Sequence, residues 1–333
     1  MKTNFTYLIF IATCFIATLL DSCSKGTPAS IDGINTSSVV TISNVTTESV
    51  GKVYATIRFT VLPNSEQNTL KSVSVRYFTS NEGGIEVIKE KGELVSAKSD
   101  PNQPDSYVCS LTKLTAGTSY SYVICVKINQ EIIYSNILSF KTESWIIPEG
   151  AVDLGLSVLW GTCNVGASKP EKFGNKYAWG ELQEKAKYTW DNYKWGSEYH
   201  LKKYCTDGYY GPADNKHILD LEDDVAHVIL GGNWRMPTYS ECVELIDNCK
   251  WEWDWVGDVK GITITGKNGN TIFLPGAGAK YDGVQANFHG FYWSSYIVYN
   301  IPYISRYMRF DSYGFQMGEE YRYHGLSVRP VCD

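Results

Sequence analysis

The uneven distribution of tryptophan constrains the fold of this chain more than any other sequence feature. All ten Trp residues lie at or beyond Trp145, whereas residues 37–141 are rich in Val, Thr, Ser and Ile, with turn residues between short apolar runs. A chain of 333 residues is long enough for two domains of about 150 residues each. With 43% hydrophobic and 20% charged residues it can fill two cores. We therefore expect two domains, with a boundary near Pro148.

The N-terminal segment predicts export. Lys2 precedes an apolar run from Tyr7 to Leu20, which is shorter than the roughly 20 residues of a membrane-spanning helix but typical of a signal peptide. The run ends in Leu20-Asp21-Ser22-Cys23, which resembles a bacterial lipobox except at Asp21, where a small residue is usual. The resemblance implies cleavage after Ser22 and lipidation of Cys23. A plain secretory signal or an uncleaved anchor are the alternatives, and Cys14 is the weaker candidate for lipidation.

These features predict where the protein lies. We expect a signal peptide over residues 1–22, followed by a flexible tether over residues 23–37 that is rich in Ser, Thr, Gly and Pro. The membrane is then a partner through the lipid anchor. The predicted location is the outer membrane, on its periplasmic or its external side, and we favour the external side. The net charge of -6, without a block of basic residues, excludes a typical nucleic-acid-binding surface.

The cysteines offer little for metal binding. Seven remain besides Cys14 and Cys23, an odd number, and none forms the C-x-x-C pairs that are typical of zinc sites. Cys163 and Cys332 are the best candidates for a disulfide, because they would join the two ends of the second domain. Cys242 and Cys249 would lie about 10 Å apart on one helix, too far for a bridge.

The first domain reads as a β-sandwich. Apolar and polar residues alternate along residues 53–61, as in a strand with one buried face. The pattern Leu-x-x-Leu-x-x-Gly-Thr-x-Tyr over Leu111–Tyr120 resembles a fibronectin type III domain, here over residues 38–143. The resemblance implies that the Tyr120 hydroxyl ties the loop to the backbone. The second strand lacks the usual core Trp, so the wider immunoglobulin-like class is the safer assignment, with a spacer role. Gln103-Pro104-Asp105 reads as a turn.

The second domain carries seven motifs in order. They are Asp153–Trp160, Cys163–Ala167, Tyr177–Glu181, Gly231–Thr238, Asn268–Pro275, Tyr292–Ser295 and Ser327–Val331. Together they resemble the Fibrobacter major paralogous domain, here over residues 148–333. The resemblance implies an α+β fold of C-type-lectin-like type, related to the DUF1566 domains of bacterial surface proteins, and it brings no general assigned reaction. The predicted fold class is thus an all-β sandwich followed by an α+β domain.

Local signals place several elements of the second domain. Thr238 and Glu241 form a capping box, which predicts a helix over residues 239–248. A helix before it would be capped by Asp220 or Asp223. Residues 266–269 predict a hairpin turn between two alternating strands.

Aromatic residues supply the candidate ligand site. The segment Tyr188–Tyr210 combines many Tyr and Trp with Lys, Asp and Gly, a composition typical of adaptable binding surfaces. A second such segment is Tyr292–Tyr323, and long loops commonly carry function. Trp251, Trp253 and Trp255 would share one face of a strand, as a core edge or as a sugar platform. The candidate ligand-binding residues are Trp190, Tyr193, Trp195, Tyr199, Tyr209 and Trp253.

Catalytic and metal signals are weak. The five His residues form no H-E-x-x-H motif, and neither a G-x-S-x-G motif nor a glycine-rich phosphate loop is present. The carboxylates are scattered, so we predict no metal, no cofactor and no enzyme activity. We expect a non-catalytic cell-envelope lipoprotein that presents a C-type-lectin-like module to an extracellular glycan or protein. A structural or fimbria-associated assembly component is the alternative, and a glycan-acting hydrolase is less favoured.

Overall fold

The computed structural model describes residues 35–79, 84–281, 284–285, 289–311 and 313–333. The signal peptide, the lipidation site at Cys23 and all but the end of the tether lie outside these residues. Among the described helices, none combines the length and the apolar character that crossing a membrane requires.

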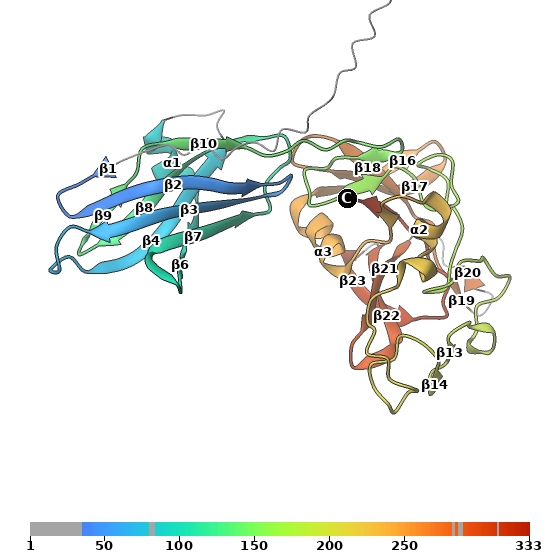
Figure 1. Ribbon diagram of the computed structural model, residues 1–333. Coiled ribbons are helices and arrows are strands. Elements are labelled where there is room, and N and C mark those ends of the chain that lie inside the picture. Colours follow the sequence, from blue (N-terminus) through green and yellow to red (C-terminus); the bar gives the residue numbers. More distant parts are fainter. Residues whose placement is uncertain (1–34, 80–83, 282–283, 286–288, 312) are drawn as a thin grey trace, which may run out of the picture.

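The first domain is a sandwich of two antiparallel sheets (Figure 1). One sheet has the order β1-β2-β3-β7-β6, with strands at Asn35–Thr36, Val40–Val50, Tyr54–Pro63, Gln103–Thr112 and Lys98–Asp100. The other has the order β10-β8-β4-β5, with strands at Leu138–Lys141, Ser119–Ile128, Leu70–Thr79 and Glu93–Ser96. Strand β9 (Glu131–Tyr134) also pairs with β8, and helix α1 spans Ile85–Lys91.

The sandwich core follows from alternation along the strands. Ala55, Ile57, Phe59 and Val61 of β3 are buried between the sheets, which confirms the expected pattern. The predicted tyrosine corner is also confirmed, because the backbone N–H of Thr115 donates to the Tyr120 hydroxyl at 2.8 Å.

The turn predicted at Gln103-Pro104-Asp105 is wrong. These residues begin strand β7, and the turn comes just before them, where the backbone N–H of Asn102 donates to the Asp100 carboxylate at 3.0 Å. Asp100 of β6 pairs with Gln103 of β7, so the turn lies between these two residues and Pro104 is already part of the strand.

The second domain consists of small sheets with two helices. A four-stranded sheet joins β11 (Ala151–Val152), β12 (Leu159–Gly161), β24 (Val331–Cys332) and β15 (Trp234–Arg235). Two three-stranded sheets contain β16 (Lys250–Val256), β17 (Val259–Thr265) and β18 (Thr271–Pro275), and β21 (Gly290–Val298), β22 (Ile301–Asp311) and β23 (Gly314–Tyr321). The short pairs are β13 (Gly196–Ser197) with β14 (His200–Leu201), and β19 (Lys280–Tyr281) with β20 (Val284–Gln285).

The helix predictions are confirmed for one helix and corrected for the other. Helix α3 (Tyr239–Asn248) begins at the predicted capping box, with the Glu241 backbone N–H 3.2 Å from Thr238 Oγ1. Helix α2 (Val225–Leu230) is capped by Asp224, not by Asp220 or Asp223, and a 3-10 turn, η2 (Leu221–Asp223), precedes it. The hairpin at residues 266–269 is confirmed between β17 and β18.

The seven cysteines among the described residues are free thiols, so the Cys163–Cys332 disulfide is not formed. Register explains why. Cys332 lies opposite Leu159 in the β12–β24 pair, so Cys163 is displaced along the chain by about 13 Å at about 3.3 Å per residue, beyond disulfide reach.

Residues of the predicted motifs hold the core of the second domain together. The Trp293 indole donates to the Tyr177 carbonyl at 2.8 Å, and the Trp179 indole donates to the Ser294 carbonyl at 2.9 Å. The fully buried Arg329 donates to three oxygens. Segments far apart in sequence are thereby joined by satisfied polar groups, which buried side chains require.

Candidate functional site

Five tyrosines from two distant segments form one surface, which we call the tyrosine surface: Tyr199, Tyr209, Tyr210, Tyr303 and Tyr321. Their ring centroids lie 5.1 to 6.1 Å apart from neighbour to neighbour. Tyr199 is 52% exposed and Tyr209 is 72% exposed. The structure thus joins the two aromatic segments that the sequence singled out separately.

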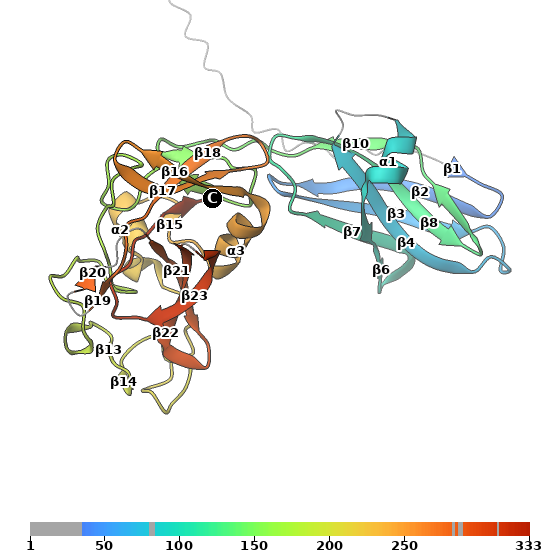
Figure 2. The ribbon, with the colours of Figure 1, turned by 180° about the vertical axis from the view of Figure 1, so that it is seen from behind.

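Tyr199 lies in the turn of the hairpin β13–β14, and Tyr209 and Tyr210 follow the hairpin in the chain. The ribbon views show this hairpin at the same end of the second domain as β22 (Figures 1 and 2). The backbone N–H of Leu201 donates to the Tyr210 carbonyl at 2.7 Å, which folds the following segment back onto β14. A side chain at Gly196 would meet the His200 carbonyl oxygen at 2.0 Å, and its φ of +101° favours glycine. Tyr303 and Tyr321 come from β22 and β23, where Ile304 pairs with Tyr321.

A buried arginine fixes this loop to the β22–β23 hairpin. Arg322 is fully buried, and its Nε donates to the Tyr193 hydroxyl at 2.9 Å. Its terminal nitrogens donate to the carbonyls of Lys203, Tyr204 and Pro302 at 3.0 to 3.1 Å. One guanidinium therefore connects both segments that carry the tyrosine surface, through the rigid fork of donors that arginine provides.

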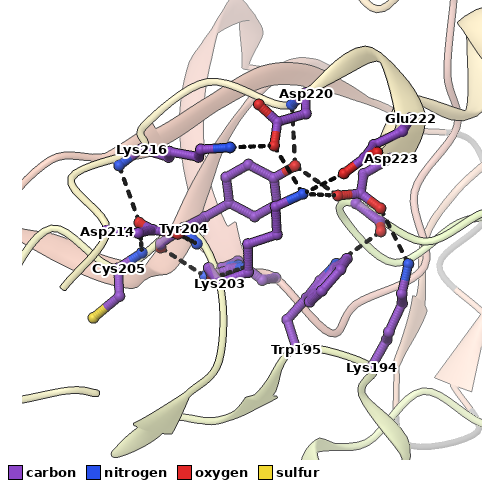
Figure 3. A network of polar contacts seen from close by, with 12 residues as sticks. Lys194, Trp195, Lys203, Tyr204, Cys205, Asp214, Lys216, Asp220, Glu222 and Asp223 are labelled. Atoms are coloured by element: carbon purple, nitrogen blue, oxygen red, sulfur yellow. Dashed lines mark hydrogen bonds and ion pairs between the residues drawn. The ribbon is translucent and has the colours of Figure 1, made fainter. Parts of the chain in front are cut away.

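Lys203 of this loop lies at the centre of a cluster of three acidic residues (Figure 3). Lys203 Nζ lies 2.8 Å from Asp220, 3.0 Å from Glu222 and 2.7 Å from Asp223. Burial alone would lower the pKa of Lys203, but the hydrogen bonds to these carboxylates outweigh it and raise the pKa. These three acids are a group of described residues that could surround a metal ion. The ammonium already supplies the positive charge at that position.

Further lysines complete the neutralisation of this network. Lys194 pairs with Asp223 at 3.1 Å, and Lys216 pairs with Asp220 at 2.6 Å. Asp214 accepts the backbone N–H groups of the loop at Tyr204 and Cys205. The network is therefore a structural anchor of the loop, and Figure 3 shows that its charged groups point toward one another.

The six predicted site residues fall into different environments. Tyr199 and Tyr209 are part of the tyrosine surface. Trp190, in the 3-10 turn η1 (Trp190–Asn192), is half-buried at its edge, with ring centroids 6.1 Å from Tyr321 and 4.8 Å from Tyr323.

Two of the predicted site residues serve the core instead. Tyr193 is 5% exposed, and its hydroxyl donates to the Trp179 carbonyl at 2.8 Å, so its assignment as a ligand contact is wrong. Trp195 is half-buried, with its indole N–H donating to the Gly180 carbonyl at 2.8 Å and Lys194 Nζ 4.0 Å from the ring centroid.

Trp253 belongs to another surface. It is 43% exposed on β16, with Phe310 at 5.7 Å between ring centroids and Lys260 Nζ 4.6 Å from its ring. Trp251 is buried on the same strand, and Trp255 is exposed. Phe310 and Tyr303 lie seven positions apart on β22, which separates the surfaces by roughly 23 Å at about 3.3 Å per residue.

Tyr210, Tyr303 and Tyr321 were not singled out from the sequence, although each lies in a highlighted aromatic segment. Their alignment depends on the strand register of β22 with β23 and on the fold of the 196–211 loop. The sequence showed that these segments are rich in aromatic residues, but not which of their rings would lie together.

The strongest catalytic candidate is a buried pair. Lys176 Nζ donates to Ser327 Oγ at 2.6 Å, a combination that can activate a serine nucleophile. Lys176 is 3% exposed and Ser327 is fully buried. A substrate would therefore have to displace core residues to reach the hydroxyl, and the pair fits a packing role better.

Comparison with known proteins adds a limited result. Neither a protein-family model nor a curated protein matches this chain. Among solved structures, the sensor domain of the anti-sigma factor RsgI4 from Pseudobacteroides cellulosolvens is 16% identical, covering 35% of this chain and 100% of its own, with a TM-score of 0.24. A computationally redesigned β-sandwich protein is 17% identical, covering 32% and 94%, with a TM-score of 0.25. A bromine derivative of BhCBM56 is 13% identical, covering 33% and 98%, with a TM-score of 0.22.

Proposed function

We propose that this chain is a non-catalytic cell-envelope lipoprotein that binds an extracellular glycan through the tyrosine surface. In this proposal Cys23 carries the lipid, the sandwich is a spacer, and the second domain is a C-type-lectin-like member of the Fibrobacter major paralogous family. The outer surface of the outer membrane is the proposed location.

The observation that supports binding is a contiguous set of rings on the anchored loop and on β22 and β23, of which Tyr199, Tyr209 and Tyr321 are exposed. Flat rings with a polar hydroxyl suit sugars, which present apolar faces and hydroxyl edges. Isolated exposed aromatics would need no explanation, whereas five neighbouring rings gathered from two segments form a surface of the kind that marks an interaction site.

The test is a glycan array with the soluble chain from Ser24 onward, followed by titration of the hits. Each of Tyr199→Ala and Tyr209→Ala is expected to weaken binding by roughly 2- to 10-fold, since an aromatic contact contributes about 0.5–1.5 kcal/mol. Tyr313→Ala is the matched control, because Tyr313 is 96% exposed and lies outside the tyrosine surface. Binding that survives both substitutions would refute this site, provided that circular dichroism shows folded variants.

An assembly role is the second candidate, and helix α2 favours it. Val228, Ile229 and Leu230 are each about half exposed there, close to the exposed Leu221, an apolar patch that suits protein contact. In that case Ile229→Ser should reduce sedimentation of the soluble chain with isolated envelopes, and Tyr209→Ala should not. The opposite pattern would favour the glycan-binding function.

A further inference from the structure

The tyrosine surface carries two carboxylates without a cationic partner. The Glu198 carboxylate lies beside the Tyr199 hydroxyl and raises the pKa of Tyr199 through a hydrogen bond and its charge. The Asp207 carboxylate accepts the Tyr209 backbone N–H at 2.9 Å. Neither acid belongs to an ion pair of the described residues, unlike the acids of the Lys203 network below the loop.

The ring faces of this surface are also free of cations. Elsewhere in the domain Lys194 lies 4.0 Å from the Trp195 ring, Lys203 lies 5.0 Å from the Tyr204 ring, and Arg322 lies 4.9 Å from the Trp179 ring. Within the described ranges, none of the cation–π contacts involves a ring of the tyrosine surface. Aromatic faces carry negative potential, so the rings and the two carboxylates together give this surface negative potential.

We propose that the ligand of the tyrosine surface is an amine-bearing glycan, one whose hexosamine units carry free, protonated amines. This inference rests on the glycan-binding function proposed above. The ammonium groups would lie over the tyrosine faces and near Glu198 and Asp207, and the sugar rings would stack on the remaining faces. A lysine-rich protein segment offers the same charge, but its flexible side chains would leave flat rings at 5.1 to 6.1 Å spacing without stacking partners.

The expected gain in affinity can be estimated from exposed cation–π contacts and exposed ion pairs. Each is expected to strengthen binding by roughly two- to fivefold. An oligosaccharide that engages one ring face and one carboxylate should therefore bind about tenfold more tightly than its neutral counterpart. Lys202 lies in the same loop without an ion pair among the described residues, and its charge opposes this attraction.

The experiment compares fully deacetylated and fully N-acetylated glucosamine oligomers of equal length, titrated calorimetrically into the soluble chain at mildly acidic pH. We expect about tenfold tighter binding of the deacetylated oligomer. Glu198→Gln keeps a hydrogen-bonding side chain without the charge, and it should weaken that binding by about threefold and leave binding of neutral glycans unchanged. Lys202→Gln should strengthen binding of the deacetylated oligomer, and Tyr313→Ala should change neither.

The outcomes separate this inference from the function on which it rests. Equal affinity for both oligomers, or binding of array glycans that lack amines in preference to the deacetylated oligomer, would overturn the inference and leave glycan binding standing. If the protein binds no glycan at all, both the amine preference and the glycan-binding function are refuted. If oligolysine competes as well as the deacetylated oligomer at equal charge, the ligand is a basic protein segment and the inference of an amine-bearing glycan is overturned.

Discussion

The buried Lys176 allows a quantitative test of how the second domain is packed. Its Nζ has a hydrogen bond to Ser327 Oγ but belongs to no ion pair of the described residues. The pKa of Lys176 is lowered from 10.5 to about 7, mainly by burial and in smaller part by the neighbouring charge of Lys280, while the charge of Glu184 opposes the change. A buried ammonium without a carboxylate is costly, so the folded domain favours the neutral amine.

The sign of the resulting pH dependence follows from where each state holds the proton. The unfolded chain keeps it up to about pH 10.5, whereas the folded chain releases it above about pH 7. Between these values unfolding takes up a proton, so the free energy of unfolding rises with pH across this window. Below the window the buried ammonium destabilises the fold by a constant amount, and this group adds no pH dependence. The difference of 10.5 minus 7 pKa units corresponds to at most about 5 kcal/mol, at about 1.4 kcal/mol per unit.

The perturbation is Lys176→Met, measured by denaturant unfolding from about pH 7 to about pH 10. Tryptophan fluorescence reports the second domain, since all ten Trp lie at or beyond Trp145. The free energy of wild-type unfolding minus that of the variant should rise by a few kcal/mol over this range, because contributions common to both proteins cancel. Lys187→Met, at an exposed position, should show a constant difference. A constant difference for Lys176→Met as well would refute the reasoning.

Three further predictions concern the sandwich, helix α3 and the loop anchor. Tyr120→Phe should lower the free energy of unfolding by about 1–2 kcal/mol in the circular dichroism transition, since the Thr115 N–H loses its acceptor; an unchanged midpoint would contradict this. Thr238→Ala should cost about 1 kcal/mol in the fluorescence transition, and Thr238→Ser should restore most of it. Lys203→Ser removes the ammonium that Asp220, Glu222 and Asp223 share, so millimolar calcium should raise the melting temperature of this variant and not of the wild type.

Local features were predictable because their causes lie close together in the sequence. The strand alternation around Ile57, the capping box at Thr238 and the turn at residues 266–269 depend on neighbours within a few positions. The cap of α2 was not predictable in this way. Three acids, Asp220, Asp223 and Asp224, precede the helix closely, and the sequence alone does not choose among them. In the structure Asp224 is the cap, whereas Asp220 and Asp223 pair with Lys203.

The candidate site was predictable as two aromatic segments but not as a set of side chains. Composition does not distinguish Tyr193 from Tyr199. Tyr193 is buried and accepts a hydrogen bond from Arg322, whereas Tyr199, six positions later, is exposed. The sequence likewise could not show that Trp253 lies beside Phe310, because that contact joins two separate sheets. Exposure within an aromatic segment is decided by such long-range partners.

The interior charges of the second domain make sense as supports of an exposed site. Tyr193, Leu201 and Tyr204 hold parts of the loop to the core. If its remaining polar stretches had to be ordered on binding, affinity would fall by about 0.5–1.5 kcal/mol for each side chain immobilised. Arg322 and Lys203 remove much of that cost in advance, because they hold the loop backbone and its acids in the folded protein. Buried ions contribute little net stability, so their presence beneath exposed rings is better explained by the geometry that they impose on the tyrosine surface.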